Sequence, residues 1–347
     1  MTALLELPAI HAALPPELEA HEPPEARGQT RDAVRLMVSR SAAGEVRHHA
    51  FPEFPDLLLP GDLLVVNNSA TLPAAIELPD QMSVHFSTAM PAGDWLVELR
   101  SGHGSATVPC RGGAPGQRFC LPGGAVLTLA EPFSGRLWHA RLSTAVIPYL
   151  LRYGAPIRYS YVPVRWSIDA YQTVFAIRPG SAEMPSAARP FTPEIVTRLV
   201  AKGVAIAPVT LHTGVSSLEG GEDPYPESFE VPAATARLVN LTRQHGGRVI
   251  AAGTTVVRAL ESAVTGREQE HAGPVGAAAG WTSHVVTPKT GVAVVDGLLT
   301  GLHEPRSTHL WMLAAFAPAG LLNRCYEQAA DRRYRWHEFG DVHLLLP

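Results

Sequence analysis

The chain has 347 residues, of which 46% are hydrophobic and 17% are charged, and its formal net charge is −4. This composition excludes an intrinsically disordered chain, and it lacks the basic excess that is usual for proteins bound to nucleic-acid backbones. The length predicts two domains. Pro318 and Gly320 interrupt the longest apolar segment and the N-terminus lacks a secretory pattern, so we expect a cytoplasmic protein without a membrane span.

The pattern of predicted secondary structure changes at about residue 73. A proline-rich lead-in is followed by two predicted strands, over 34–39 and 62–66. Beyond residue 73, short predicted strands separated by Gly/Pro turns cover 95–100, 117–121, 125–129 and 137–142. Regular short strands of this kind are typical of a small barrel or sandwich. We therefore expect an inserted all-β, barrel-like domain of residues 73–154 in a main domain of residues 1–72 and 155–347.

Residues 203–262 carry the clearest α/β pattern. The predicted elements are a strand over 203–211, a helix with Pro232 in its first turn, a strand over 248–252 and a helix that opens at Gly253. Continuous apolar strands are typical of a sheet that is buried on both faces. The fold class of the main domain is therefore α/β (α+β). Because free N–H groups and loop side chains converge where strands end and helices begin, ligands are expected at these joints.

Short motifs with polar residues recur along the chain. They cover residues 61–67, 171–176, 179–181, 191–192, 210–214, 253–262, 295–300, 303–308, 334–335 and 339–341. In this order and spacing they resemble the S-adenosylmethionine:tRNA ribosyltransferase-isomerases of queuosine biosynthesis, with this chain as a divergent member. The resemblance implies transfer and isomerisation of the ribosyl group of S-adenosylmethionine onto a 7-aminomethyl-7-deazaguanine base in tRNA. The product would be epoxyqueuosine, and adenine and methionine would be released.

The resemblance implies S-adenosylmethionine as co-substrate and tRNA as a partner. We expect no metal, because the sequence shows no cluster of metal ligands and Cys110, Cys120 and Cys325 have no metal-ligand spacing. Free thiols are favoured over a bridge between Cys110 and Cys120, since we expect a reducing compartment.

The implied reaction needs a general base, because the sulfonium acidifies the adjacent C–H group. His212 and His303 are the candidates, since imidazole titrates near neutral pH. Asp296 and Glu261 are candidates for assisting the departure of adenine. Two structural alternatives stay open: each histidine could be satisfied by backbone groups, and Glu261 could pair with Arg258 along one helix.

The remaining candidates are substrate-binding residues. Contacts to the sulfonium could come from Tyr171, Phe191, Glu227 and Trp281, although aromatic residues in an α/β core more often pack. Gly253, Thr254 and Thr255 could hold the methionine carboxylate, or Thr254 could simply cap the helix. Ser307 and Thr308 read more strongly as a helix cap than as a binding site. The motifs add five further substrate-binding candidates: Asn67, Gln172, Thr192, Gly214 and Arg258.

Several positions depart from the family pattern. Ala70 and Ala75 stand where basic residues are usual, and Pro190 and Tyr225 stand where histidines are usual. These changes and the acidic net charge predict weak, salt-dependent binding of tRNA. Two alternatives therefore remain open, namely an S-adenosylmethionine-consuming transferase or lyase with a small-molecule acceptor and a non-catalytic binding protein on the same scaffold.

Overall fold

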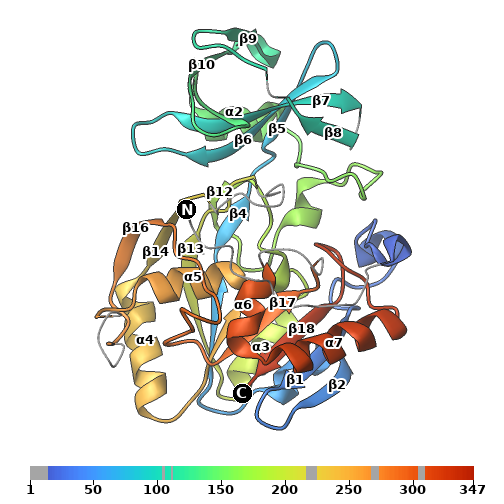
Figure 1. Cartoon of the computed structure of the whole chain (residues 1–347), viewed down its shortest axis with the longest axis vertical. Helices are drawn as coiled ribbons and strands as arrows, with labels where there is room; N and C mark the ends of the chain where they lie inside the picture. Colours follow the sequence, from blue (N-terminus) through green and yellow to red (C-terminus); the bar gives the residue numbers. More distant parts are fainter. Residues whose placement is uncertain (1–14, 104–105, 111, 216–224, 267–272, 304–308) are drawn as a thin grey trace.

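The computed structural model describes residues 15–103, 106–110, 112–215, 225–266, 273–303 and 309–347. Over these residues the chain forms a nine-stranded main sheet and a separate seven-stranded sheet, with a two-stranded sheet between them. Figure 1 shows the seven-stranded sheet beyond one end of the main sheet, connected to it through β4 (Ser69–Thr71).

The main sheet is mixed. Its strands, in spatial order, are β16 (Ala278–Thr282), β14 (Glu227–Val231), β13 (Ala205–Leu211), β3 (Leu63–Asn67), β15 (Val249–Ala252), β17 (Gly297–Gly301), β18 (Val342–Leu346), β1 (Arg35–Arg40) and β2 (Glu45–Ala50). The central strands β13, β3, β15 and β17 are parallel, whereas β14 runs antiparallel to β13, and β18 antiparallel to β17. We name the end where the four parallel strands finish the carboxyl end of the sheet, and the opposite end the amino end.

Helices cover both faces of the main sheet. They are α1 (Phe54–Leu57), α3 (Pro193–Ala201), α4 (Ala233–Gln244), α5 (Thr254–Ser262), α6 (His309–Phe316) and α7 (Ala319–Asp331). Successive residues of a strand point to opposite faces. Leu63 and Val65 of β3 therefore pack in the core under α4 and α5, whereas Leu64 and Val66 pack in the core under α1 and α3. Because helices pack on both faces, the loops that join strands and helices lie at the two ends of the sheet.

The predicted strands over 203–211 and 248–252 are confirmed, with small shifts of their ends. Pro232 is the residue before α4 and not part of its first turn, because its extended backbone precedes the first helical residue. The sequence patterns missed β14 and β16, two outer strands of the sheet.

The seven-stranded sheet is antiparallel. It comprises β5 (Ala75–Leu78), β6 (Met82–Ala89), β7 (Trp95–His103), β8 (Ala106–Pro109), β9 (Arg118–Cys120), β10 (Val126–Pro132) and β11 (Leu137–Leu142). Its own core includes Phe86, Leu127 and Leu137, closed on one side by α2 (Val146–Tyr153). A mixed α/β main sheet with a separate antiparallel, half-barrel sheet confirms the expected fold class. The exact domain boundaries remain a prediction.

The connecting segments contain short 3₁₀ turns and one small sheet. The turns are η1 (Pro16–Leu18), η2 (Pro24–Arg27), η3 (Phe51–Glu53), η4 (Pro122–Gly124), η5 (Ile168–Tyr171) and η6 (Ser186–Ala188). The small sheet pairs β4 with β12 (Arg178–Ser181). It directs the chain from β3 toward the half-barrel and brings 178–181 beside the end of β13.

Several contacts join the half-barrel to the main domain, and two of them involve side chains near the loop after β13. The hydroxyl of Tyr225 lies 3.1 Å from Ser134 Oγ, and its ring packs against Phe133. On β6, Ser87 Oγ accepts a hydrogen bond from the amide of Val215 at 3.0 Å. The second contact ties the half-barrel to the loop that leaves the carboxyl end of β13.

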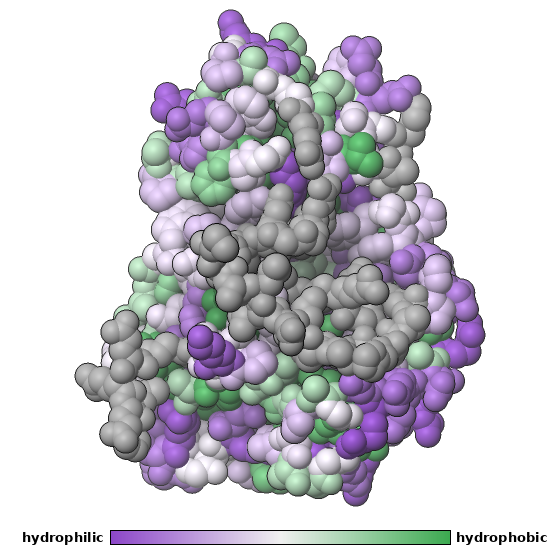
Figure 2. All heavy atoms as spheres, viewed as in Figure 1, coloured by the Kyte–Doolittle hydropathy of each residue, from purple (hydrophilic) through white to green (hydrophobic). Residues whose placement is uncertain are grey.

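Other sequence-based expectations concern the surface and the thiols. In the part of the chain that the structure describes, no helix is long and apolar enough to cross a membrane. All three cysteines are free thiols. Figure 2 shows hydrophilic side chains gathered at the lower right of the molecule, where Figure 1 places α7 and β2.

Candidate active site

The carboxyl end of the main sheet is organised by Asn67, the last residue of β3. Its side-chain oxygen accepts hydrogen bonds from the amides of Ser69 at 3.0 Å and Leu211 at 3.1 Å. Its amide group donates to the Leu211 carbonyl at 2.9 Å and to Thr255 Oγ1 at 3.2 Å. Asn67 is fully buried, so it holds β3, β13 and the start of α5 together instead of facing a ligand.

The start of α5 presents free backbone donors. Gly253 has a φ of 106°, in the left-handed region that favours glycine, and lets the chain turn directly from β15 into the helix. No described side chain caps this helix, and the amides of Thr254 and Thr255 form no hydrogen bond with described residues. The positive end of the helix dipole and these donors form a site suited to a carboxylate.

A chain of hydrogen bonds orients His212, which follows β13. Ser69 Oγ lies 2.8 Å from His212 Nδ1 and 2.6 Å from Ser181 Oγ. The Thr213 amide donates to Ser181 Oγ at 3.1 Å. Space for the imidazole depends on Gly180, since a Cβ atom there would lie 2.4 Å from His212 Nδ1.

The chain of hydrogen bonds allows two tautomers of His212, because a hydroxyl oxygen can accept two hydrogen bonds. Either Ser69 donates to Nδ1 and the proton of the neutral ring is on Nε2, or Nδ1 donates to Ser69 and Ser69 donates to Ser181. Nε2 forms no hydrogen bond with a described residue. Burial and the nearby charge of Arg178 lower the pKa of His212, so the ring is neutral at neutral pH.

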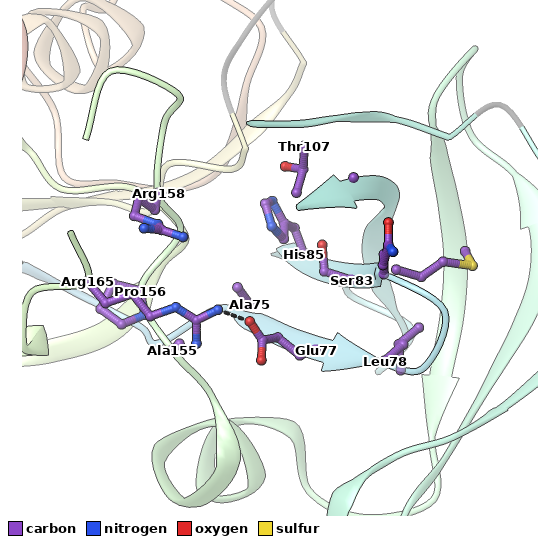
Figure 3. A pocket seen from close by; sticks show the side chains of 13 residues that line it. Ala75, Glu77, Leu78, Ser83, His85, Thr107, Ala155, Pro156, Arg158 and Arg165 are labelled. Atoms are coloured by element: carbon purple, nitrogen blue, oxygen red, sulfur yellow. Dashed lines mark ion pairs between the residues drawn. The ribbon is translucent and has the colours of Figure 1, made fainter. Parts of the chain in front are cut away.

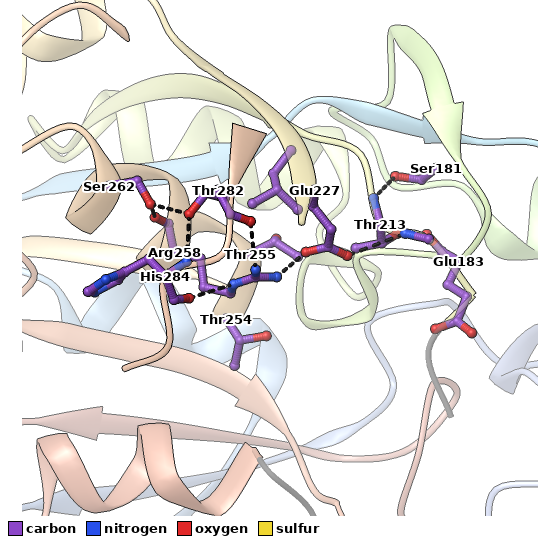
Figure 4. A network of polar contacts seen from close by, with 12 residues as sticks. Ser181, Glu183, Thr213, Glu227, Thr254, Thr255, Arg258, Ser262, Thr282 and His284 are labelled. Atoms are coloured by element: carbon purple, nitrogen blue, oxygen red, sulfur yellow. Dashed lines mark hydrogen bonds and ion pairs between the residues drawn. The ribbon is translucent and has the colours of Figure 1, made fainter. Parts of the chain in front are cut away.

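On the other side of the His212 loop, Glu227 and Arg258 form an ion pair (Figure 4). Glu227 also accepts from the amide of Gly214 at 3.3 Å, and Arg258 donates to the carbonyl groups of Thr282 and His284. Burial raises the pKa of Glu227, an effect that the charge of Arg258 partly offsets. The pair fixes the loop against α5 and β16.

Two stacked imidazoles lie beyond β17. The ring centroids of His303 and His309 are 3.9 Å apart, and His309 Nε2 lies 3.3 Å from Thr254 Oγ1. Burial, with the neighbouring imidazoles of His309 and His337, holds the pKa of His303 well below its ordinary value. His303 is therefore neutral at neutral pH and is positioned beside the start of α5.

Two glutamates that sequence reasoning missed complete this end of the sheet. Burial, followed by the charge of Glu183, raises the pKa of Glu338 to about 8, and Glu338 Oε1 has no hydrogen-bond partner among the described residues. Glu183 accepts a hydrogen bond from the Tyr159 hydroxyl, and its backbone carbonyl accepts from Thr213 Oγ1 at 2.8 Å. Glu183 lies two residues after the motif of residues 179–181, and Glu338 directly precedes the motif of residues 339–341. This closeness to the motifs is the sequence signal that could have identified them.

Asp296 and Glu261 lie outside this site, contrary to expectation. Asp296 immediately precedes β17, so it lies at the amino end, where it is exposed and accepts from the Val249 amide at 2.8 Å. Glu261 is buried and accepts from the amides of Ala293, Val294 and Val295. Both carboxylates hold the loop that leads into β17. The structure also places the partner of Arg258 at Glu227 and not at Glu261.

Four other expected binding residues have structural roles. Phe191 is buried among Phe51, Phe54 and Phe175, so it does not face a cation. Thr192 caps α3 by accepting from the Ile195 amide.

Gln172 exchanges two hydrogen bonds with the backbone of Thr71, at 3.0 and 2.8 Å. Tyr171 is buried against Phe339, 5.3 Å between ring centroids. Trp281 is half-buried on β16, one residue before Thr282. Ser307 and Thr308 lie outside the described residues.

Comparison with known proteins agrees with this architecture. A family model described as "Queuosine biosynthesis protein" matches residues 10–345. An S-adenosylmethionine:tRNA ribosyltransferase-isomerase of Geobacter metallireducens is 37% identical over 348 residues, covering 95% of this chain and 96% of the relative. One of Thermotoga maritima is 33% identical over 356 residues, covering 96% and 97%.

A solved structure covers the same extent. The crystal structure of an S-adenosylmethionine tRNA ribosyltransferase from Thermotoga maritima matches with a TM-score of 0.54 at 28% identity, covering 97% of this chain and 99% of that one. Both the family model and the curated relatives span nearly the full length of the chain. The chain therefore belongs to the S-adenosylmethionine:tRNA ribosyltransferase-isomerase family.

Proposed function

We propose that the carboxyl end of the main sheet is where this chain transfers and isomerises the ribosyl group of S-adenosylmethionine onto 7-aminomethyl-7-deazaguanine in tRNA. Adenine and methionine leave, and epoxyqueuosine is formed. The full-length match to the family carries the activity. The convergence of neutral imidazoles, carboxylates and free helix amides at one end of the sheet supports the location.

The methionine carboxylate and the sulfonium of S-adenosylmethionine each have a suitable group at this site. The free amides of Thr254 and Thr255 at the start of α5 suit the methionine carboxylate. Glu183 and Glu338 suit the sulfonium, because a cation beside them would stabilise the charged form of Glu338, which burial and then the charge of Glu183 disfavour.

The proposed roles of the two histidines rest on the tautomer in which Ser69 donates to His212 Nδ1. With its proton on Nε2, the neutral His212 ring donates a hydrogen bond to the departing adenine, so its role differs from the base that the sequence suggested. His303 is neutral and takes the part of the general base for the C–H group next to the sulfonium. The carboxylate of Asp296 has no part in these steps.

The acceptor is tested by incubating the protein with S-adenosylmethionine and tRNA that carries 7-aminomethyl-7-deazaguanine. The matched control is the same tRNA with guanine at that position. Mass spectrometry follows adenine, methionine and the modified nucleoside. Adenine release that requires the deazaguanine supports the proposal. Adenine release that is independent of RNA would favour the small-molecule or lyase alternative, and a folded protein that neither binds nor consumes S-adenosylmethionine would contradict all enzymatic readings.

A further inference from the structure

A polar cavity of ≈ 250 Å³ lies between the half-barrel and the linker that returns to the main domain (Figure 3). Strands β5 and β6 form one wall, with Glu77, Ser83 and His85, and the linker contributes Arg158 and Arg165. None of the residues that we assign to the carboxyl end of the main sheet lines this cavity. It is therefore distinct from the proposed catalytic site.

The strand wall carries polar groups that the protein itself does not satisfy. Ser83 is only 7% exposed, and its Oγ has no hydrogen-bond partner among the described residues. His85, two residues along the same face of β6, is 6% exposed, and its ring forms no hydrogen bond with a described residue. Burying the Ser83 hydroxyl without a partner costs roughly 1–3 kcal/mol. A polar ligand in the cavity would give the Ser83 and His85 side chains a hydrogen-bond partner.

The imidazole of His85 is neutral. Burial, and then the charge of Arg100, lowers its pKa to about 3. A neutral ring presents one N–H donor and one acceptor nitrogen, the pair of functions found along the edge of a nucleobase. Leu78 and Met82 add apolar surface to the same cavity.

The linker wall is cationic. Arg165 is paired with Glu77. Among the described residues, Arg158 forms no ion pair, and its side chain donates only to the Pro163 carbonyl, at 2.7 Å. Figure 3 shows Arg158 on the linker side of the cavity, across from His85 on β6. A guanidinium in this position suits a phosphate group.

Strand β6 connects the cavity to the loop that follows His212. Ser87, two residues beyond His85 and about 7 Å along the strand, contacts the loop that carries His212 through the Val215 amide. The same loop comes close enough to β6 that a Cβ atom on Gly214 would lie 2.6 Å from Ser87 Oγ. A polynucleotide that presents a base to the catalytic site can thus place a neighbouring nucleotide in the cavity.

We propose that this cavity binds one nucleotide of the RNA acceptor next to the modified base, with its base edge on Ser83 and His85 and its phosphate on Arg158. The proposal rests on the proposed function, since it takes RNA as the acceptor. The volume of the cavity is just below the range of roughly 300–1,000 Å³ that is usual for ligand sites, so the cavity can take at most one nucleotide.

The test measures tRNA affinity as a function of salt for the wild type, His85→Ala and Arg158→Ala. The control is Arg141→Ala, an exposed arginine on β11 that does not line the cavity. We expect Arg158→Ala to weaken binding about tenfold and to reduce the salt slope by roughly 0.7–0.9, the value for one phosphate contact. His85→Ala should weaken binding about tenfold without changing the slope, and Arg141→Ala should match the wild type.

Calorimetric binding of S-adenosylmethionine separates this proposal from the proposed function. Wild-type tRNA affinity in both His85→Ala and Arg158→Ala would overturn the cavity proposal alone. A wild-type protein that binds S-adenosylmethionine but no RNA would overturn both the RNA acceptor and the cavity proposal. If His85→Ala does not fold, the affinity and salt slope of Arg158→Ala decide the question.

Discussion

The two ends of the main sheet both carry polar and ionisable side chains, but these side chains differ in whether they have hydrogen-bond partners within the protein. At the amino end, Asp62 binds the backbone and side chain of Arg248, and Asp296 binds the Val249 amide. At the carboxyl end, His212 Nε2 and Glu338 Oε1 have no partner among the described residues. Polar groups whose hydrogen bonds are formed within the protein stabilise the fold. Polar groups that lack a hydrogen-bond partner in the protein are available to a substrate.

Substitution at the amino end should give the largest effect, and on stability. Burial alone raises the pKa of Asp62, but the hydrogen bonds and charge of Arg248 outweigh it and hold the pKa below its ordinary value. Asp62→Ala leaves Arg248 half-buried without its partner, which costs roughly 3–5 kcal/mol of unfolding free energy. Urea denaturation measures this, with the exposed Asp296→Ala expected to lose only about 1 kcal/mol. Equal losses in the two variants would contradict this view of the amino end.

Crowding the carboxyl end should reduce the rate instead. In Gly180→Ala the new methyl group displaces the His212 ring from Ser69, because the Cβ atom would lie 2.4 Å from Nδ1. Because a shift of a reacting group by about 1 Å can cost about 10²-fold in rate, we expect adenine release to slow by about 10²-fold. Circular dichroism checks the fold, and Gly320→Ala, with nothing within 4 Å of its Cβ, is the matched control. A wild-type rate in Gly180→Ala would show that the position of His212 is unimportant.

A smaller effect should follow from removing the donor to His212. Ser69→Ala frees Nδ1 and, in the proposed tautomer, no longer fixes the proton on Nε2. We expect kcat to fall about tenfold with the KM for S-adenosylmethionine unchanged, because the ring still occupies its place but is no longer held in one tautomer. Steady-state kinetics measure both constants. A change confined to KM would assign Ser69 to binding instead.

The smallest effect concerns pH. The raised pKa of Glu338 means that the folded protein keeps this proton between the ordinary value of 4.5 and about 8, where the unfolded chain has lost it. The folded state then binds more protons, so stability falls as pH rises through this interval. In Glu338→Gln that part of the fall is absent, so the variant should gain Tm relative to the wild type as the pH rises from 5 to 9, by roughly 2–4 °C for each kcal/mol of stability that the wild type loses. Thermal scans from pH 5 to 9 test this, and parallel curves would contradict it.

The sequence predicted the elements better than their direction. The strands over 203–211 and 248–252 and the half-barrel follow from apolar runs and turn signals. Asp296 and Glu227 both stand at the beginning of a strand, yet they lie at opposite ends of the sheet. The reason is that β17 is parallel to β15, whereas β14 is antiparallel to β13. Strand direction depends on long-range pairing, which local sequence patterns do not contain.

The same limit applies to the residues that sequence reasoning missed. Glu183, Glu338 and His309 come from three loops or helix starts that are distant in sequence and meet only in the folded chain. Conversely, Phe191 and Gln172 belong to motifs that resemble the family. In the structure, however, Phe191 packs in the core and Gln172 forms hydrogen bonds with the backbone. A sequence motif indicates a position in the fold, whereas the composition of the site depends on which side chains the folded chain brings together.

The most direct test of the central claim compares His212→Ala with Asp296→Ala in one assay of adenine release, with S-adenosylmethionine and tRNA carrying 7-aminomethyl-7-deazaguanine. If the carboxyl end of the sheet is the catalytic site, His212→Ala is slower than the wild type by about 10²-fold or more and Asp296→Ala turns over at the wild-type rate. A folded His212→Ala with the wild-type rate, or an Asp296→Ala that folds but does not release adenine, would contradict the account.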